Sequence, residues 1–153
     1  MQSVKKANTV LNTSPAKKFR TIIPIRFEHC DTAGIVYYPR FYLMLALVIE
    51  RWFDVIGCDY WHLHMERGEG IPVVRTECDF LQPSRLGDQL EFILEVERLG
   101  HKSFTLSIRA RGKGEDEDRL RARMVLVWSR IHPGPTGIPI PDKYRAAIEK
   151  YLT

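Results

Sequence analysis

The segment spanning residues 39–56 constrains the fold more than any other part of the sequence. Apolar residues recur in it at the three- and four-residue spacing of a helix, and others fill most of the remaining positions. The first series is Tyr42, Leu45, Ala46, Ile49, Phe53 and Ile56, and the second is Leu43, Met44, Leu47 and Val48. Pro39 suits the first turn of a helix and Gly57 suits its end. A helix that is apolar on most sides is expected to be enclosed rather than to lie on a surface.

Segments of strand composition lie on both sides of this helix in the sequence. Residues 19–27 precede it, and Pro24 within them indicates an edge strand or a bulge. Four more strands are expected after the helix, over residues 71–81, 88–100, 102–112 and 119–132. The connection over residues 58–70 is polar, and Asp142 is expected to cap a short helix near the C-terminal end.

This order of elements predicts an α+β fold, in which an antiparallel five-stranded sheet wraps around one long central helix. One sheet covers only one side of a helix, and its edge strands remain unpaired. We therefore expect two copies of the chain to form a homodimer. Residues 19–153 are expected to form a single domain, preceded by a flexible polar tail over residues 1–18.

Composition narrows the classes of function. The chain has 153 residues, 44% of them hydrophobic, which is enough for one domain with a sizeable core. Its net charge of +4 suits a ligand that carries phosphates, but it is too small to imply nucleic acid by itself. The three cysteines form no CxxC pair, so neither a disulfide framework nor a zinc site is expected. No apolar run is long enough to span a membrane, and the first residues lack the apolar region of a secretory signal, so we expect a cytoplasmic protein.

Asp31 is the candidate for catalysis, in the stretch HCDTAGIVYYPRFY over residues 29–42. It could serve as a turn or cap residue, as a metal ligand or as a catalytic carboxylate. It lies too far ahead of Pro39 to cap a helix that begins there, and Gly34 permits a positive φ or a close approach of the backbone to a ligand. We expect the carboxylate beside the first turn of the helix, whose N–H groups can stabilise an oxyanion. A carboxylate there can deprotonate water or attack a carbonyl, which suggests hydrolysis of a thioester, because a thiolate leaves readily.

The same stretch resembles the active-site segment of the hotdog-fold thioesterases, in particular the 4-hydroxybenzoyl-CoA thioesterase family. The matching residues are Asp31, Ala33, Gly34, Ile35, Val36, Tyr37, Tyr38 and Pro39. Residues 72–92 are similar to the second and third strands of that family, and the resemblance covers residues 21–132. Thr32 departs from the proline that is common after the aspartate in the family.

The resemblance implies roles for individual residues. Asp31 would be the nucleophile or the general base, and the backbone N–H of Tyr38 would polarise the thioester carbonyl. Gly34 and Tyr37 would lie against the substrate. The acyl group would lie between two subunits, with CoA running out over the surface, and the family suggests a dimer of dimers. No cofactor and no metal are expected.

The stretch RLGHKSF over residues 98–104 is similar to a family segment whose basic residues meet the CoA phosphates. Lys102 is the best match, with Arg98 and His101 as weaker candidates. Gly100 departs from this pattern, because the family is more basic there. Together these features predict an acyl-CoA thioesterase, with an aryl substrate such as 4-hydroxybenzoyl-CoA.

Several alternatives stay open at this point. The substrate could be a short- or medium-chain fatty acyl-CoA or an acyl-carrier-protein thioester, and a non-catalytic hotdog protein could bind acyl-CoA or nucleic acid through its arginine-rich late strands. A hydratase would need a histidine soon after the aspartate, and none follows within the motif. His29 could orient Asp31 or simply be solvated, and Cys30 could act as a nucleophile with His29 as its base. Glu50 could form an ion pair or face a pocket, and His62 with His64 weakly suggests a metal.

Overall fold

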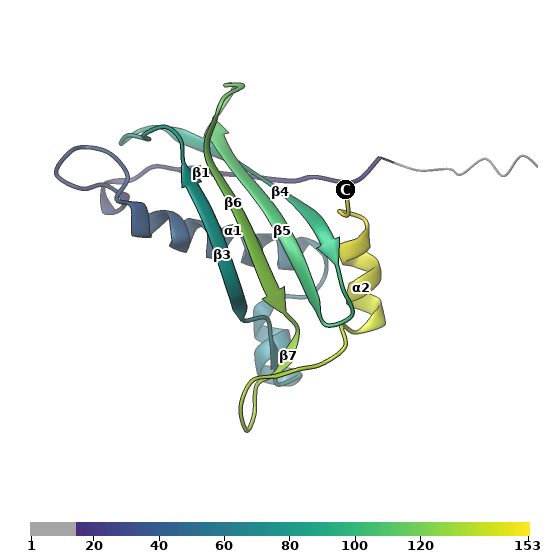
Figure 1. Ribbon diagram of the computed structural model, residues 1–153. Helices are drawn as coiled ribbons and strands as arrows, with labels where there is room; N and C mark the ends of the chain where they lie inside the picture. Colours follow the sequence, from purple (N-terminus) through teal and green to yellow (C-terminus); the bar gives the residue numbers. More distant parts are fainter. Residues whose placement is uncertain (1–14) are drawn as a thin grey trace, which may run out of the picture.

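Five strands form one antiparallel sheet in the order β1-β4-β5-β6-β3, in a computed structural model that describes residues 15–153 (Figure 1). Their bounds are β1 Phe19–Pro24, β3 Val73–Phe80, β4 Gln89–Leu99, β5 Ser103–Gly112 and β6 Asp118–Val127. The predicted wrapping of a sheet on one long helix is confirmed. Pro24 ends the edge strand β1, where its missing N–H breaks no ladder.

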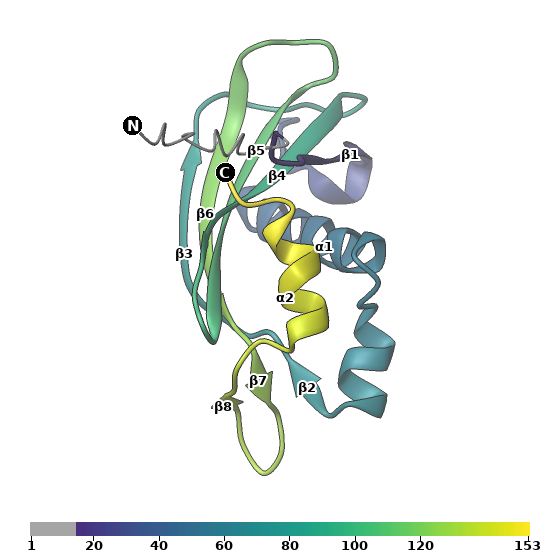
Figure 2. The same ribbon diagram turned by 90° about the vertical axis from the view of Figure 1, so that its right-hand side faces the viewer.

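Helix α1, Tyr38–Val55, packs on one face of this sheet, and α2, Asp142–Glu149, lies on the same side (Figure 2). The strand residues that point toward α1 alternate with outward ones, as in Leu120, Ala122, Met124 and Leu126 of β6. They form one core with the buried side of α1. The largest fully buried side chains in this core include Trp52, Phe53, Phe92, Phe104 and Trp128.

The expectation that α1 is enclosed holds only for the side that faces the sheet. Its buried residues are Phe41, Met44, Leu45, Val48, Ile49, Trp52 and Phe53. Tyr42, Leu43 and Leu47 are apolar or aromatic and are exposed, because a single sheet covers one side of a helix. In a single chain, this apolar side of α1 therefore stays exposed.

The structure adds detail to one prediction, the polar connection, and contradicts another, the cap of α2. The connection over residues 58–70 contains a helical segment, η2 (His62–Glu66), and a short strand, β2 (Glu69–Gly70). β2 pairs with β7 (Ser129–Arg130), which pairs with β8 (Thr136–Gly137), so these segments form a separate small sheet. Asp142 does not cap α2, because it is the first helical residue and Pro141 takes the N-cap position.

Residues 1–14 of the predicted tail lie outside the described residues. At its end, the backbone N–H of Lys17 donates to Lys150 O at 2.9 Å, and Lys18 forms an ion pair with Glu95 at 2.8 Å. Among the described helices, none combines the length and the apolar character that crossing a membrane would take.

Candidate active site

Asp31 lies in a tight hairpin that precedes α1, after the 3-10 turn η1 (Phe27–His29). Its backbone N–H donates to Ile35 O at 3.0 Å, and its carboxylate accepts the N–H of Ala33 at 2.8 Å. Gly34, at φ +75°, donates its N–H to Asp31 O at 3.0 Å. The positive φ that the sequence allowed at Gly34 is therefore used to close this turn.

The hairpin carries the chain directly into the N-terminus of α1. Tyr37 is the N-cap residue, and its N–H donates to His29 O at 2.9 Å. Tyr38 follows as the first helical residue, and its N–H has no acceptor among residues 15–153. Pro39 has no N–H, so Tyr38 presents the free donor at this end of the helix. The hydrogen bonds of Asp31 stay within the hairpin and do not join it to Tyr38.

An apolar hollow of about 260 Å³ opens beside this helix terminus. Tyr38 and Phe41 of α1 line it from one side, and Phe80 at the end of β3 lines it from another. The ring of Phe80 lies within 6.4 Å, centroid to centroid, of the rings of Tyr38, Phe41 and Tyr42. The backbone donor of Tyr38 thus lies next to a surface made largely of aromatic rings.

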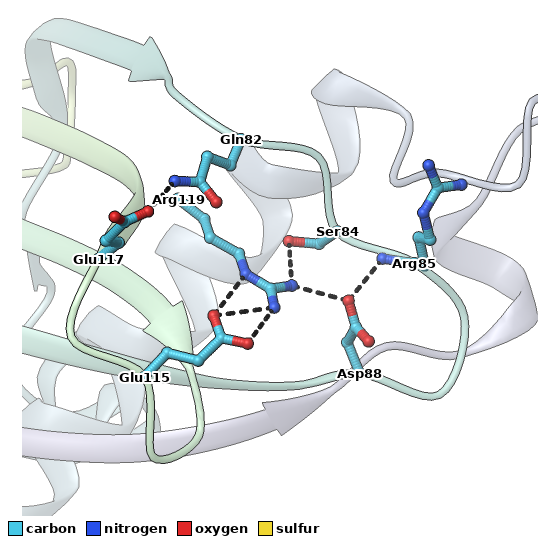
Figure 3. Close-up of polar contacts among 7 residues, drawn as sticks. All are labelled: Gln82, Ser84, Arg85, Asp88, Glu115, Glu117 and Arg119. Carbon is cyan, nitrogen blue, oxygen red and sulfur yellow. Dashed lines mark hydrogen bonds and ion pairs between the residues drawn. The ribbon is translucent and has the colours of Figure 1, made fainter.

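The loop between β3 and β4, residues 81–88, forms the rest of the hollow and supports the hairpin. Ser84 O accepts the N–H of Val36 at 2.8 Å, and Arg85 forms a β-bridge with Ile35. On its other side the loop meets the guanidinium of Arg119, which donates to Asp88 at 2.7 Å and to Ser84 Oγ at 3.3 Å (Figure 3). The loop is therefore held between the hairpin that carries Asp31 and β6.

Asp88 is the one carboxylate in this loop, at its end. Its Oδ2 accepts the backbone N–H of Arg85 at 2.8 Å as well as the Arg119 guanidinium. These contacts, first the backbone N–H and then the guanidinium, lower the pKa of the Asp88 carboxyl below its ordinary value. Asp88 is therefore ionised in the folded protein at neutral pH.

The basic residues assigned to CoA lie at the other end of the sheet. Arg98, His101 and Lys102 are exposed around the turn between β4 and β5. β4 begins beside the loop that supports the hairpin and runs from Gln89 to Leu99, about 33 Å at roughly 3.3 Å per residue. A single chain does not bring these residues to Asp31.

The neighbours of Asp31 have other partners. His29 Nδ1 accepts the N–H of Arg26 at 2.8 Å, and Cys30 Sγ donates to Arg26 O at 3.6 Å. The two side chains thus bind the Arg26 backbone rather than each other, and His29 makes no hydrogen bond to Asp31. Glu50 is exposed on α1, and its charge adds to the effect of burial in raising the pKa of Tyr60.

The remaining candidates are held in ordinary structural contacts. His62 lies 2.6 Å from Glu66, and His64 Nδ1 lies 2.7 Å from Tyr60 O. Within residues 15–153 no three histidine, cysteine or acidic side chains gather where they could hold a metal ion. The arginines of β5 and β6 form ion pairs with carboxylates: Arg109 and Arg121 with Asp118, Arg111 with Glu91, Arg119 with Asp88 and Glu115, and Arg123 with Glu97.

The sequence did not single out Phe80, Ser84 or Asp88, and it placed Arg119 only among the basic residues of the late strands. Phe80 reads as an ordinary strand residue, and Arg119 lies 31 positions from Asp88. The pairings of β3 with β6, β4 with β5 and β5 with β6 together bring these residues close, and no local pattern in the sequence predicts that arrangement. The turn residues in PSRLGD, residues 83–88, are the one signal that a tight loop carries Asp88.

Comparisons with known proteins indicate the family of the chain and its fold. The family model described as the thioesterase superfamily matches residues 48–118. A 1,4-dihydroxy-2-naphthoyl-CoA hydrolase from Synechococcus elongatus is 31% identical over 86 residues, which are 56% of this chain and 63% of that protein. The chain thus aligns with less than two thirds of the length of this relative.

Two solved structures extend the likeness over most of the chain. The 4-hydroxybenzoyl-CoA thioesterase from Pseudomonas sp. strain CBS-3 is 26% identical with a TM-score of 0.76, covering 86% of this chain and 99% of that one. A 1,4-dihydroxy-2-naphthoyl-CoA thioesterase from Synechocystis, at 21% identity, has a TM-score of 0.79 and covers 86% of this chain and 96% of its own. The second of these likenesses bears on the fold alone.

Proposed function

We propose that this chain, which belongs to the thioesterase superfamily and has the hotdog fold, hydrolyses an aromatic acyl-CoA thioester to the free acid and CoA. The observation that carries the proposal is the free N–H of Tyr38, which lies beside an aromatic hollow at the end of the hairpin that holds Asp31. Thioester hydrolysis needs a donor for the carbonyl oxygen, a carboxylate and room for the acyl group.

The chemistry follows from these groups. The N–H of Tyr38, at the positive end of α1, donates to the thioester oxygen and stabilises the negative charge that develops on it. Asp31 then acts in one of two ways. As a nucleophile it bonds to the carbonyl carbon and expels the CoA thiolate, and water hydrolyses the resulting anhydride. As a general base it takes a proton from water, whose oxygen bonds to the carbonyl carbon as the thiolate leaves and is protonated. Both routes consume one water and release the acid and CoA.

Two observations support an aromatic acyl group. The hollow is bounded by the rings of Tyr38, Phe41 and Phe80, which can pack edge to face on another ring. The relative from Synechococcus elongatus and the structure from Pseudomonas are named for a naphthoyl and a hydroxybenzoyl thioester. We therefore place the substrate among hydroxylated aromatic acyl-CoAs.

We propose that the working form is a homodimer or a dimer of such dimers, in which the acyl group lies between two subunits. A two-fold axis perpendicular to the sheet at the exposed edge of β3 turns the second sheet end for end. That rotation brings the β4–β5 turn of the partner to the same end of the joint sheet as Asp31. Lys102, with Arg98 and His101, would then meet the CoA phosphates, while Gly34 and Tyr37 lie against the substrate. The three free thiols, Cys30, Cys58 and Cys78, support a reducing cytoplasmic setting.

The substrate class is tested by thiol release from a panel of thioesters at matched concentrations. The panel contains 4-hydroxybenzoyl-CoA, 1,4-dihydroxy-2-naphthoyl-CoA, hexanoyl-CoA, palmitoyl-CoA and an acyl-carrier-protein thioester. We expect kcat/KM for one of the two aromatic thioesters to exceed that for both fatty acyl-CoAs by at least tenfold. A preference for hexanoyl-CoA would replace the aromatic proposal with a fatty acyl-CoA thioesterase. No release from any member would refute the enzyme and leave an acyl-CoA-binding protein.

A further inference from the structure

Arg119 joins two loops that are far apart in the sequence. Its guanidinium donates to Glu115 in the β5–β6 turn through Nε and Nη2, at 2.8 to 3.2 Å. Through Nη1 it donates to Asp88 at 2.7 Å and to Ser84 Oγ at 3.3 Å, both in the β3–β4 loop. Figure 3 shows the guanidinium between the carboxylates of Glu115 and Asp88. Its side chain is only 13% exposed, so these are partly desolvated, charge-assisted contacts.

The far side of the same loop carries the candidate site. Ser84, which is buried, accepts the N–H of Val36 through its backbone oxygen at 2.8 Å. Arg85 forms a bridge with Ile35, and Ile35 O accepts the N–H of Asp31 at 3.0 Å. Each step from the guanidinium to the backbone of Asp31 is therefore a direct contact.

Other contacts hold the two ends of the loop: Gln82 Nε2 donates to Glu117 at 2.7 Å, and the N–H of Gly87 donates to Ile25 O at 3.1 Å. The N–H groups of Leu81 and Gln82 both donate to Arg119 O, at 2.9 and 3.2 Å, so the start of the loop is bound to the backbone of β6 whatever side chain stands at position 119. Its end is fixed where Asp88 O accepts the N–H of Ile25 at 2.8 Å. Between these ends, the Ser84–Arg85 segment that supports the hairpin is held by the guanidinium and by Asp88.

We propose that Arg119 is a positioning residue for the active site: it fixes the β3–β4 loop, and thereby the hairpin that sets Asp31 relative to the N–H of Tyr38. This inference rests on the proposed thioesterase activity, and it adds a residue that touches neither substrate nor Asp31. Because small displacements of a catalytic group cost large factors in rate, we expect losing Arg119 to lower kcat rather than to raise KM.

The test compares Arg119→Met, Arg119→Lys and Asp88→Asn with Arg123→Met. Arg123 lies on the same strand and pairs with Glu97, but its partner is not in the supporting loop. Rates are measured with the best thioester of the panel, at a temperature where every variant is folded by circular dichroism. We expect kcat to fall about tenfold or more in Arg119→Met, less in Arg119→Lys, and less than twofold in Arg123→Met, with KM within threefold throughout.

A second readout separates positioning from general stability and does not depend on activity. Amide hydrogen exchange over residues 30–37 should be at least tenfold faster in Arg119→Met and in Asp88→Asn than in Arg123→Met. Combining Arg119→Met with Asp88→Asn should lower kcat no further than Arg119→Met alone, since both act through one loop. If Arg119→Met is unstable, the faster exchange over residues 30–37 is still expected in Asp88→Asn alone.

Two outcomes would overturn the inference. One is unchanged exchange over residues 30–37 in both loop variants, whatever the rate. The other is a folded Arg119→Met enzyme with wild-type kcat. A wild-type protein that releases no thiol from any thioester refutes the proposed function instead, and the exchange measurement then still decides whether Arg119 holds the hairpin.

Discussion

At the level of single residues, a proline and a glycine determine the backbone of the candidate site. Pro39 removes one N–H from the first turn of α1, and the N–H of Tyr38 is left as the donor. Gly34 closes the Asp31 hairpin with a φ of +75°, which a residue with a side chain adopts only at a cost of about 1–2 kcal/mol. These features are local, and the sequence predicts them because Asp31, Gly34 and Pro39 lie within nine positions.

Asp88 provides a prediction on pH. Its folded-state pKa is lowered by the Arg85 N–H and by Arg119, so the ionised form stabilises the native state. That stabilisation is complete above the unfolded pKa, near 3.9, and is lost as the pH falls through the lower folded-state pKa. We therefore compare how far the free energy of unfolding declines between pH 5 and pH 3. We expect this decline to be about 1 kcal/mol smaller in Asp88→Asn than in the wild type, a figure that allows for the partial exposure of the Asp88 side chain.

Urea unfolding followed by circular dichroism at several pH values measures this difference. Asp116→Asn is the control, because Asp116 is an exposed carboxylate at the tip of the β5–β6 turn. Parallel pH profiles for Asp88→Asn and the wild type would show that the contacts of Asp88 add nothing to stability.

At the scale of elements, the helix and the five main strands were predictable and their distant contacts were not. Alternation in residues 119–127 and helical spacing in residues 39–56 are strong signals, because each element buries one face. The helical segment and the short strand within residues 58–70 could not be predicted, because they are too short to show a hydrophobic period. The pair of Arg119 with Asp88 depends on the register of β3 against β6, which no single segment encodes.

Phe80 lies between β3 and α1 at the hollow, and it leads to a prediction on specificity for the acyl group. It belongs to β3, yet its ring lies against the first turns of α1, 5.8 Å from the ring of Phe41. Phe80→Ala removes an aromatic wall from the proposed acyl site. We expect kcat/KM to fall about tenfold for the preferred aromatic thioester and less than threefold for hexanoyl-CoA. Phe27→Ala is the control, since Phe27 is 84% exposed in η1 and does not line the hollow. An equal loss for both thioesters would mean that Phe80 supports the fold rather than the choice of acyl group.

At the level of the whole molecule, a single chain keeps the candidate catalytic residue and the candidate CoA-binding residues apart. The Asp31 hairpin and the Lys102 turn lie at opposite ends of the sheet, and apolar residues of α1 stay exposed. A second copy that pairs along β3, as proposed above, would bring Lys102 of the partner subunit to the Asp31 end of the joint sheet. Antiparallel pairing about Thr76 would also set Arg75 opposite Glu77 of the partner subunit, on the outer face of the joint sheet.

Charge reversal on β3 tests this arrangement. We expect Glu77→Arg to raise the dimer dissociation constant at least tenfold, because Arg75 would then face a like charge. The double variant Arg75→Glu with Glu77→Arg should restore association. Sedimentation velocity over a concentration series measures both, with Glu149→Arg on α2 as the control. Unchanged association in Glu77→Arg would place the interface, or its register, elsewhere.

The role of Asp31 is the central claim, and the rate of the chemical step tests it most directly. Single-turnover thiol release from the preferred aromatic thioester would be compared in the wild type, Asp31→Asn and Asp116→Asn, with binding measured separately by calorimetry. We expect Asp31→Asn to lower the rate at least a thousandfold and to change the dissociation constant less than fivefold, while Asp116→Asn resembles the wild type. A folded Asp31→Asn protein that releases thiol within tenfold of the wild-type rate would contradict this expectation.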